Sequence, residues 1–173
     1  MGETYKIVVT GAFSVGKTQL IKTISEIPVV STERRITDRH RSVKEETTVA
    51  MDYGQVQLGN DLFHIYGTPG QPRFDFMSRI LATGMDALLI LVDSSDRETF
   101  LVANQLLRRL GHAHDTPCLV VANKQDQPEA LKPDRINEVL NLGDDVPVVP
   151  CVAYDQSSVR LVMEETRVRL NRG

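Results

Sequence analysis

A glycine motif at a strand-to-helix junction constrains this chain more than any other feature. Residues 11–18, GAFSVGKT, fit the pattern G-x-x-x-x-G-K-[ST]. The apolar residues 5–11 before it read as a strand, and residues 16–26 continue with helical spacing. Because this motif works only between a strand and a helix, its context predicts a loop that binds phosphate groups.

Apolar runs of strand length alternate with helix-length patterns along the chain, which is typical of a parallel sheet covered by helices. Continuous apolar runs predict two central strands that are buried on both faces, and residues 47–67 predict a hairpin toward one edge, turning at Gly59-Asn60-Asp61. The central strands are expected over residues 85–93 and 117–124, a last strand over 146–153, and helices over 94–111, 132–143 and 156–171. We predict one α/β domain over residues 1–173, with a six-stranded, mostly parallel sheet, one antiparallel hairpin strand and helices on both faces.

Residues 28–46 do not fit this alternation, because they are polar and rich in both charge signs. A loop of this length in a compact domain is usually functional or disordered. We expect either a solvated surface loop or a loop that becomes ordered only when a ligand is present.

Composition excludes some classes of partner. Lys and Arg number 20 against 23 Asp and Glu, so a net charge of −3 gives no strong attraction to nucleic acid or to an anionic membrane. Cys118 and Cys151 lie at the edges of apolar runs and are expected to be buried hydrophobic residues. No segment approaches the ~20 apolar residues that span a bilayer, and no leader or lipidation pattern is evident. The sequence therefore predicts a cytoplasmic protein without an autonomous membrane anchor.

The phosphate loop assigns a role to each of its chemical groups. Backbone N–H groups would surround the β-phosphate, Lys17 would bind the β and γ oxygens, and Thr18 would supply a hydroxyl ligand for Mg²⁺. Gly11 and Gly16 allow the backbone to approach closely. The residues expected to contact a nucleotide here are Gly11, Ser14, Val15, Gly16, Lys17, Thr18 and Gln19.

A second motif selects the base. Asn123, Lys124 and Asp126, in VVANKQD, follow a buried strand at its carboxyl end, where ligands bind in open α/β sheets. The Asp126 carboxylate can accept hydrogen bonds from both N1–H and N2–H₂ of guanine, whereas adenine would leave it unpaired at a cost of roughly 1–3 kcal/mol. Asn123 can connect this loop to the phosphate loop, and the Lys124 stem can lie over the base.

With these motifs in this order, the chain resembles a Ras-superfamily small GTPase over nearly its whole length. It is most similar to prokaryotic Ras-like GTPases with a TTVAMDYG strand and a GTPGQ switch. The resemblance implies a P-loop NTPase small G domain that binds GTP or GDP with Mg²⁺ and hydrolyses GTP. Roadblock-type or other regulatory proteins acting on the switch regions are the partners it implies.

The resemblance also assigns residues outside the two motifs. Thr48 would bind Mg²⁺ and sense the γ-phosphate, with Thr47 as the alternative because the two are adjacent. Gly70 would donate its N–H to the γ-phosphate, and Gln71 would orient the attacking water. The Ala153 N–H would meet guanine O6, in a loop that includes Val152, Ala153 and Tyr154.

Two departures from the family pattern bear on hydrolysis. Gly67 stands where switch II has an aspartate near Mg²⁺, and either Asp52 or Asp93 is a candidate substitute. Phe13 would crowd the approach of an arginine finger from a partner, so we expect slow intrinsic hydrolysis. One alternative is a GTP- or GDP-binding interaction module with vestigial hydrolysis, and another, disfavoured by Asp126, is a P-loop kinase. The arginines of the polar segment are solvated charges, partner contacts or a finger in cis, with the first two favoured: Arg34, Arg35, Arg39 and Arg41.

Overall fold

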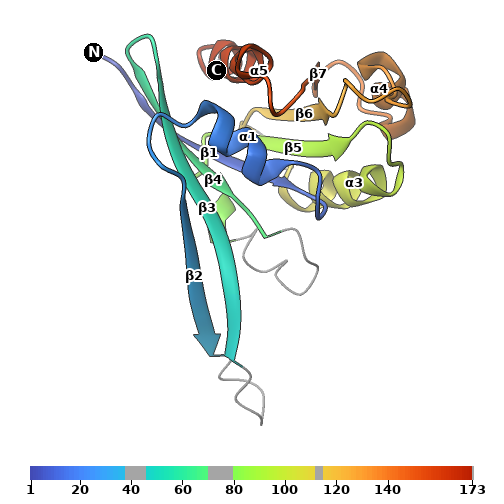
Figure 1. The fold of residues 1–173 in the computed structure, drawn as a ribbon. Helices are drawn as coiled ribbons and strands as arrows, with labels where there is room; N and C mark the ends of the chain where they lie inside the picture. Colours follow the sequence, from blue (N-terminus) through green and yellow to red (C-terminus); the bar gives the residue numbers. More distant parts are fainter. Residues whose placement is uncertain (38–45, 70–79, 112–114, 173) are drawn as a thin grey trace.

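A computed structural model describes residues 1–37, 46–69, 80–111 and 115–172, without the side chains of residues 32–50. Within this part, seven strands form one sheet in the order β2-β3-β4-β1-β5-β6-β7 (Figure 1). β3 runs antiparallel to both of its neighbours, β2 and β4, and the other neighbouring pairs are parallel. The strands are β1 (Thr4–Gly11), β2 (Val30–Thr37), β3 (Glu46–Leu58), β4 (Asp61–Gly67), β5 (Ala87–Asp93), β6 (Cys118–Asn123) and β7 (Val148–Pro150).

The mostly parallel sheet confirms the predicted fold class, but the predicted count of six strands is one too low. The additional strand is β2, which lies within residues 28–46, where we expected a loop. It pairs antiparallel with β3 from Val30 opposite Tyr53 to Thr37 opposite Glu46. Because β2 is an edge strand, it forms without the apolar face by which the other strands were recognised. Its presence also makes β3 the second strand from the edge.

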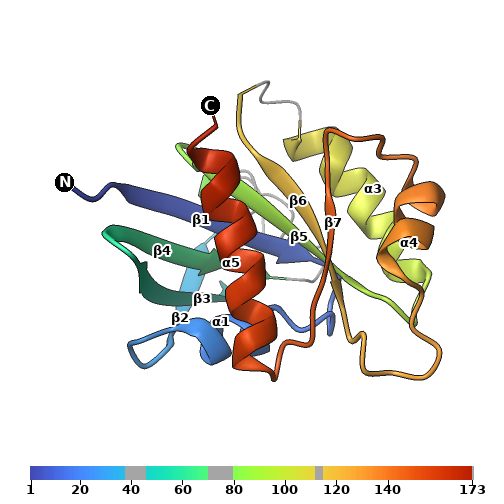
Figure 2. The ribbon, with the colours of Figure 1, turned by 90° about the horizontal axis from the view of Figure 1, so that it is seen from above.

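Four helices that lie wholly within the described residues cover the two faces of the sheet (Figure 2). They are α1 (Lys17–Ile24), α3 (Glu98–Leu110), α4 (Pro133–Leu140) and α5 (Gln156–Leu170). The Asp155 side chain caps α5 by accepting from Ser157 N at 2.8 Å. No helix in the described ranges is long and apolar enough to cross a membrane.

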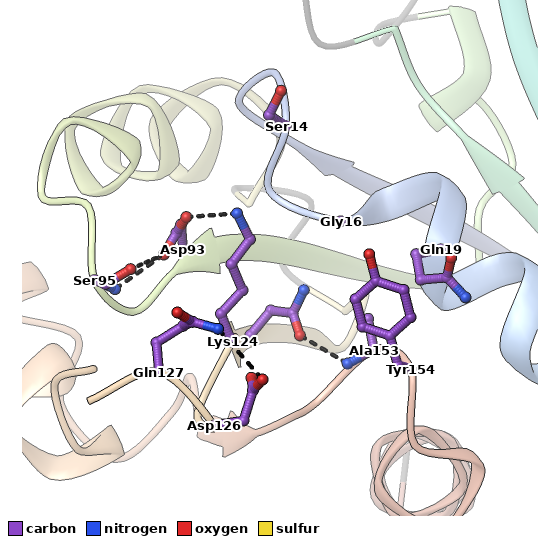
Figure 3. Close-up of a pocket in the computed structure, with 11 residues that line it drawn as sticks. Ser14, Gly16, Gln19, Asp93, Ser95, Lys124, Asp126, Gln127, Ala153 and Tyr154 are labelled. Atoms are coloured by element: carbon purple, nitrogen blue, oxygen red, sulfur yellow. Dashed lines mark hydrogen bonds and ion pairs between the residues drawn. The ribbon is translucent and has the colours of Figure 1, made fainter. Parts of the chain in front are cut away.

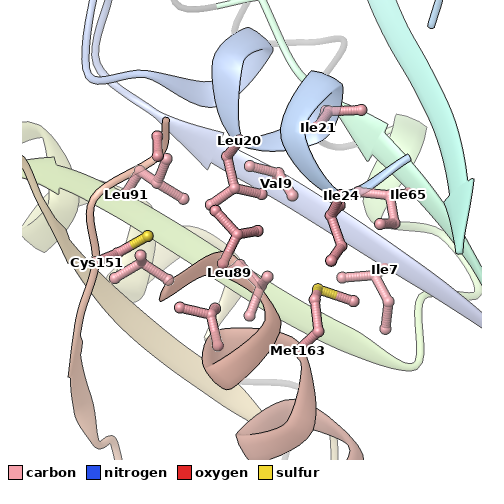
Figure 4. Close-up of a cluster of buried hydrophobic side chains, with 14 of the residues drawn as sticks. Ile7, Val9, Leu20, Ile21, Ile24, Ile65, Leu89, Leu91, Cys151 and Met163 are labelled. Carbon is pink, nitrogen blue, oxygen red and sulfur yellow. The ribbon is translucent and has the colours of Figure 1, made fainter. Parts of the chain in front are cut away.

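The buried side chains form two clusters, one on each face of the sheet. On one face, Ile7 and Leu89 pack with Leu20 of α1 and Met163 of α5 (Figure 4). On the other face, the alternate residues of β1 and β5, such as Ile90, belong to a second cluster with side chains of α3 and α4. β5 and β6 are thus buried on both faces, which confirms the prediction made from their continuous apolar sequences.

Both cysteines are buried free thiols, as predicted. Burial raises the pKa of Cys118 to about 12 and that of Cys151 to about 11. Neither thiol therefore carries charge near neutral pH. They act as small apolar side chains of the core.

Candidate functional site

A cavity of about 400 Å³ lies at the carboxyl ends of β5 and β6, beside the glycine-rich loop that follows β1 (Figure 3). Four separate parts of the chain build it: residues 14–19, residues 93–95 at the end of β5, residues 123–127 at the end of β6, and the loop before α5. The carboxyl ends of strands are where open α/β sheets bind ligands. Its lining residues are Ser14, Gly16, Gln19, Asp93, Ser95, Asn123, Lys124, Asp126, Gln127, Ala153 and Tyr154.

The glycine-rich loop packs so tightly that its glycines cannot be replaced without movement. Gly16 has a φ of +105°, and a Cβ built there would lie 2.3 Å from Nδ2 of Asn123. Gly11 has a φ of +145°, and its Cβ would lie 2.5 Å from the Leu91 carbonyl oxygen. Ser14 adopts the left-handed region, with a φ of 64°. The loop is thus held in a fixed, curved conformation that side chains at its glycine positions would disrupt.

Lys17 lies folded back into the same loop. Its Nζ donates to the carbonyl oxygens of Gly11 at 2.8 Å and Ala12 at 2.7 Å, and the residue is only 8 % exposed. Burial lowers the pKa of Lys17 to about 8, while the charge of Asp52 acts in the opposite direction. A buried ammonium paired mainly with carbonyl oxygens gains from the arrival of an anion such as phosphate.

Asn123 links the glycine-rich loop to the loop before α5. Its Nδ2 donates to the Val15 carbonyl oxygen at 2.8 Å, and its Oδ1 accepts from Ala153 N at 2.9 Å. The side chain is almost fully buried. The contact to the phosphate loop that the sequence suggested for Asn123 is therefore present, with a second contact that was not anticipated.

The loop before α5 differs in detail from the expected arrangement. We expected the Ala153 N–H to meet guanine O6, but here that N–H donates to Asn123 Oδ1. Val152 N donates to Ser158 Oγ at 2.8 Å, so it is also engaged. Tyr154 follows directly, is mostly exposed and lines the cavity. The N–H groups of both Val152 and Ala153 thus have partners within the protein.

Lys124 and Asp126 lie at the floor of the cavity. Lys124 adopts a φ of 63°, and its Nζ forms an ion pair with Asp93 Oδ2 at 2.7 Å. Burial by itself raises the pKa of Asp93, but hydrogen bonds from Lys124 and Ser95 outweigh it and lower the pKa. The Asp126 carboxylate lines the cavity, and among the described residues it accepts one weak hydrogen bond, from Gln127 Nε2 at 3.3 Å. Asp126 therefore retains acceptor capacity toward a ligand.

Thr18 contacts a carboxylate on a neighbouring strand. Its Oγ1 donates to Asp52 Oδ2 at 2.5 Å, and Ser31 Oγ donates to Asp52 Oδ1 at 2.8 Å. Asp52 on β3 is the direct partner of Gly67 on β4. Of the two candidates for the missing switch II carboxylate, Asp52 thus contacts Thr18, whereas Asp93 lines the cavity and pairs with Lys124.

The remaining predicted residues are not brought to this site within the described part of the chain. Thr48 pairs with Arg35 and Thr47 with Ile36, in the part of the hairpin that projects from the sheet (Figure 1). Thr48 lies four residues before Asp52 on β3, roughly 13 Å away at ~3.3 Å per residue. Gly70 and Gln71 fall outside the described residues.

Three polar residues that build the site were missed by sequence reasoning. Ser95 and Gln127 line the cavity. Ser94 is buried, and its Oγ donates to the Asn123 carbonyl oxygen at 2.6 Å. A signal for Ser94 existed, because it is a polar residue directly after an apolar strand, at the edge where ligands bind. For Ser95 and Gln127 the sequence offered no distinguishing feature.

Comparison with known proteins identifies the family. Residues 1–167 match the sequence model of the ADP-ribosylation factor family. An uncharacterised protein of Methanocaldococcus jannaschii is 33% identical over 91 residues, which is 52% of this chain and 51% of that protein, so the matched segment spans about half the length of that relative. The structure of the FeoB G-domain from Methanococcus jannaschii superimposes with a TM-score of 0.68 at 17% identity, covering 98% of this chain and 99% of the other, which shows a shared fold. The chain belongs to the ADP-ribosylation factor family, within the Ras superfamily of small GTPases.

Proposed function

We propose that residues 1–173 form a single G domain that alternates between GTP and GDP, with Mg²⁺ as cofactor and slow hydrolysis of GTP to GDP and phosphate. The observation that carries the proposal is the link through Asn123 between the phosphate loop and the Ala153 loop, beside a cavity that Asp126 lines. A base and a phosphate chain would thus be held by loops that the protein has already fixed relative to each other.

On the base side, Asp126 and one backbone N–H donor would make the protein specific for guanine. The Asp126 carboxylate would accept from N1–H and N2–H₂ of guanine, and the Lys124 stem would lie along the base. Guanine O6 would take its hydrogen bond from the loop of residues 152–154. With Val152 and Ala153 engaged and no acceptor for Tyr154 N in the described part of the chain, we assign this contact to Tyr154 N–H.

On the phosphate side, Lys17 would leave its carbonyl partners when a nucleotide binds and would contact the β and γ oxygens. Loop amides would surround the β-phosphate, and the start of α1 would contribute its positive end. Gln71 would orient the attacking water, and Gly70 would hold the γ-phosphate through its N–H. Loss of that phosphate would release switch II at Gly70 and the hairpin that carries Thr48.

The residues near Thr18 fit a magnesium ion. Mg²⁺ prefers hard oxygen ligands and is bound through one or two carboxylates together with substrate phosphates rather than in an all-protein cage. Thr18 and Asp52 offer a hydroxyl and a carboxylate in contact. When bound, Mg²⁺ neutralises charge on the phosphate oxygens; Thr18 would be its direct ligand, and Thr48 would join in the GTP state.

One observation favours the alternative of a binding module with vestigial hydrolysis. Phe13 is 69% exposed on the phosphate loop, where it would obstruct a partner's arginine. A regulatory protein of roadblock type would then act on the switch surfaces, residues 28–50 and 67–80. Retention of Lys17, Thr18 and Gln71 leads us to place slow hydrolysis first.

Exchange of one base contact tests the proposal. Xanthine differs from guanine by a carbonyl acceptor in place of the N2 amine, so an amide at position 126 fits it better than a carboxylate does. We expect wild-type protein to bind GDP and not ADP or xanthosine diphosphate, and Asp126→Asn to lose GDP and gain xanthosine diphosphate, measured by titration calorimetry.

The matched control is Asp134→Asn, which removes a carboxylate on α4 that does not line the cavity and should leave GDP binding unchanged. Equal affinity of the wild type for ADP and GDP would contradict the base assignment. Loss of GDP binding in Asp126→Asn without any gain of xanthosine diphosphate would contradict the direct contact.

A further inference from the structure

The carboxylate that supports the magnesium ion is on an unexpected strand. P-loop NTPases hold this ion with the loop Ser or Thr and with an Asp at the end of a nearby strand. Here β4 ends at Gly67, which offers no carboxylate. Asp52 lies on β3, the antiparallel strand beside β4, and pairs directly with Gly67, so its carboxylate lies next to the end of β4. We propose that Asp52 is the positioning residue for magnesium and its bound water in this G domain; this inference rests on the proposed function.

The contacts of Asp52 carry the proposal. Thr18, the predicted metal ligand, donates its hydroxyl proton to Asp52 Oδ2 at 2.5 Å. A hydroxyl that directs its proton to a carboxylate leaves its oxygen lone pairs available for a cation. The other carboxylate oxygen accepts from Ser31 at 2.8 Å, which fixes the orientation of the group. These are the features of a residue that orients a metal ligand from outside the coordination sphere.

The absence of a side chain at position 67 belongs to the same arrangement. A Cβ on Gly67 would lie 3.3 Å from the Asp52 Cβ, which is closer than most such contacts, and 2.8 Å from Ile21 Cδ1. The space beside β4 is therefore already filled by Asp52 and by α1. A carboxylate at position 52 and a glycine at position 67 form a complementary pair, in which the acidic group has moved from one strand to its neighbour.

The other candidate, Asp93, has a different role. Both of its oxygens are engaged, by Lys124 at 2.7 Å on one and by Ser95 N and Oγ at 3.0 and 2.6 Å on the other. Within the described residues, its contacts are to the base-binding loop and not to Thr18. Asp93 thus holds Lys124 in place, while Asp52 remains the carboxylate at the phosphate end.

The test measures GDP release from the full chain across a titration of Mg²⁺, beginning in EDTA. Mg²⁺ is expected to slow release from the wild type. In Asp52→Asn, the Mg²⁺ concentration giving half of this effect should rise by about 10- to 100-fold. Release in EDTA gives each variant its own baseline, because the charge of Asp52 also acts on Lys17 without the ion. Asp93→Asn should change release with and without Mg²⁺ alike, and Asp134→Asn, on α4, should change neither.

A second variant separates a role in magnesium binding from a purely structural role of Asp52. Asp52→Asn/Gly67→Asp returns a carboxylate to the facing position, where the nearest atom, Ile21 Cδ1, is the end of a flexible side chain and the Cβ of residue 52 would have to give by a few tenths of an ångström. We expect this double variant to bring the half-effect concentration back toward that of the wild type. A purely structural role for Asp52 would not predict such a rescue.

Three results would overturn the inference. In the first, Asp52→Asn keeps the wild-type response to Mg²⁺. In the second, the shift appears in Asp93→Asn instead. In the third, GDP binds to the wild type but its release is indifferent to Mg²⁺; nucleotide binding then stands and only the magnesium assignment fails. Failure of the wild type to bind GDP at all would instead overturn the proposed function and this inference with it.

Discussion

Removal of the Asn123 side chain should destabilise the protein in a way that the structure allows us to estimate. Asn123→Ala leaves the Val15 carbonyl and the Ala153 N–H without their partners in a region where Asn123 is only 2% exposed. Each buried group left unpaired costs about 1–3 kcal/mol, so the variant should lose about 2–6 kcal/mol of unfolding free energy. For a chain of this size, even the lower value lowers the melting temperature by about 4 °C.

Urea unfolding followed by circular dichroism, without added nucleotide, measures this loss directly. Gln127→Ala is the matched control, since it removes an amide that makes one exposed contact, to Asp126 at 3.3 Å, and it should change stability by less than about 0.5 kcal/mol. The same experiment with saturating GDP then separates stability from binding, because a variant that binds weakly gains less from the ligand.

A steric partner of Asn123 provides an internal check. Gly16→Ala places a Cβ 2.3 Å from Asn123 Nδ2, so part of its cost should vanish when Asn123 is already alanine, while the part due to φ of +105° should remain. Additive effects of the two substitutions, or a loss below about 0.5 kcal/mol in Asn123→Ala, would refute the assignment of Asn123 as the link between the loops.

Three further predictions concern the stability of the fold. Burial raises the pKa of Cys118 to about 12 and that of Cys151 to about 11, so both thiols should resist alkylation at pH 8 until the protein unfolds, and rapid labelling of native protein would contradict this. The stability that the two neutral thiols contribute should be fully present below the ordinary thiol pKa of 9.0 and should be lost as pH rises through the pKa values of the folded state. Hydrogen bonds from the backbone N–H of Glu3 and then from Arg167 lower the pKa of Asp61, so the stability that Asp61 contributes is present above the ordinary pKa of 3.8 and is lost as pH falls through its pKa in the folded state. Asp61→Asn should therefore weaken the dependence of the melting temperature on acid pH, and an unaltered dependence would count against the contact. Gly54→Ala would bring a Cβ to 2.8 Å from Ile21 Cγ2 and from Ser25 Oγ, so it should cost about 1–3 kcal/mol in urea unfolding, and a neutral result would mean that β3 and α1 are less closely packed than the structure has them.

The central part of the fold was predictable because apolar sequence alone determines it. β5 and β6 are buried on both faces, so their continuous apolar runs could hardly be anything else. β2 was missed because an edge strand can be polar, and its partner is an extension of β3 that only the hairpin register reveals. A continuous apolar run identifies a strand that is buried on both faces, but it cannot identify a polar strand at the edge of the sheet.

The site divides in the same way. The contact of Asn123 with the phosphate loop followed from the order of two motifs, each tied to the carboxyl end of a strand. The choice between Asp52 and Asp93 did not, since it depends on which residue of β3 pairs with Gly67. A shift of one residue in that register would turn Asp52 to the other face of the sheet. The three N–H groups at residues 152–154 were likewise indistinguishable without the loop geometry.

A guanine-nucleotide switch that turns over without a carboxylate at position 67 is tested most directly by single-turnover hydrolysis of GTP. Purified protein would be mixed with GTP at several Mg²⁺ concentrations, with ATP as the control substrate and nucleotide binding followed in parallel. We expect slow, Mg²⁺-dependent conversion of GTP, no conversion of ATP, and loss of conversion in Gln71→Leu. Tight binding of GTP with no conversion above the buffer background would contradict hydrolysis and would make the chain a binding module.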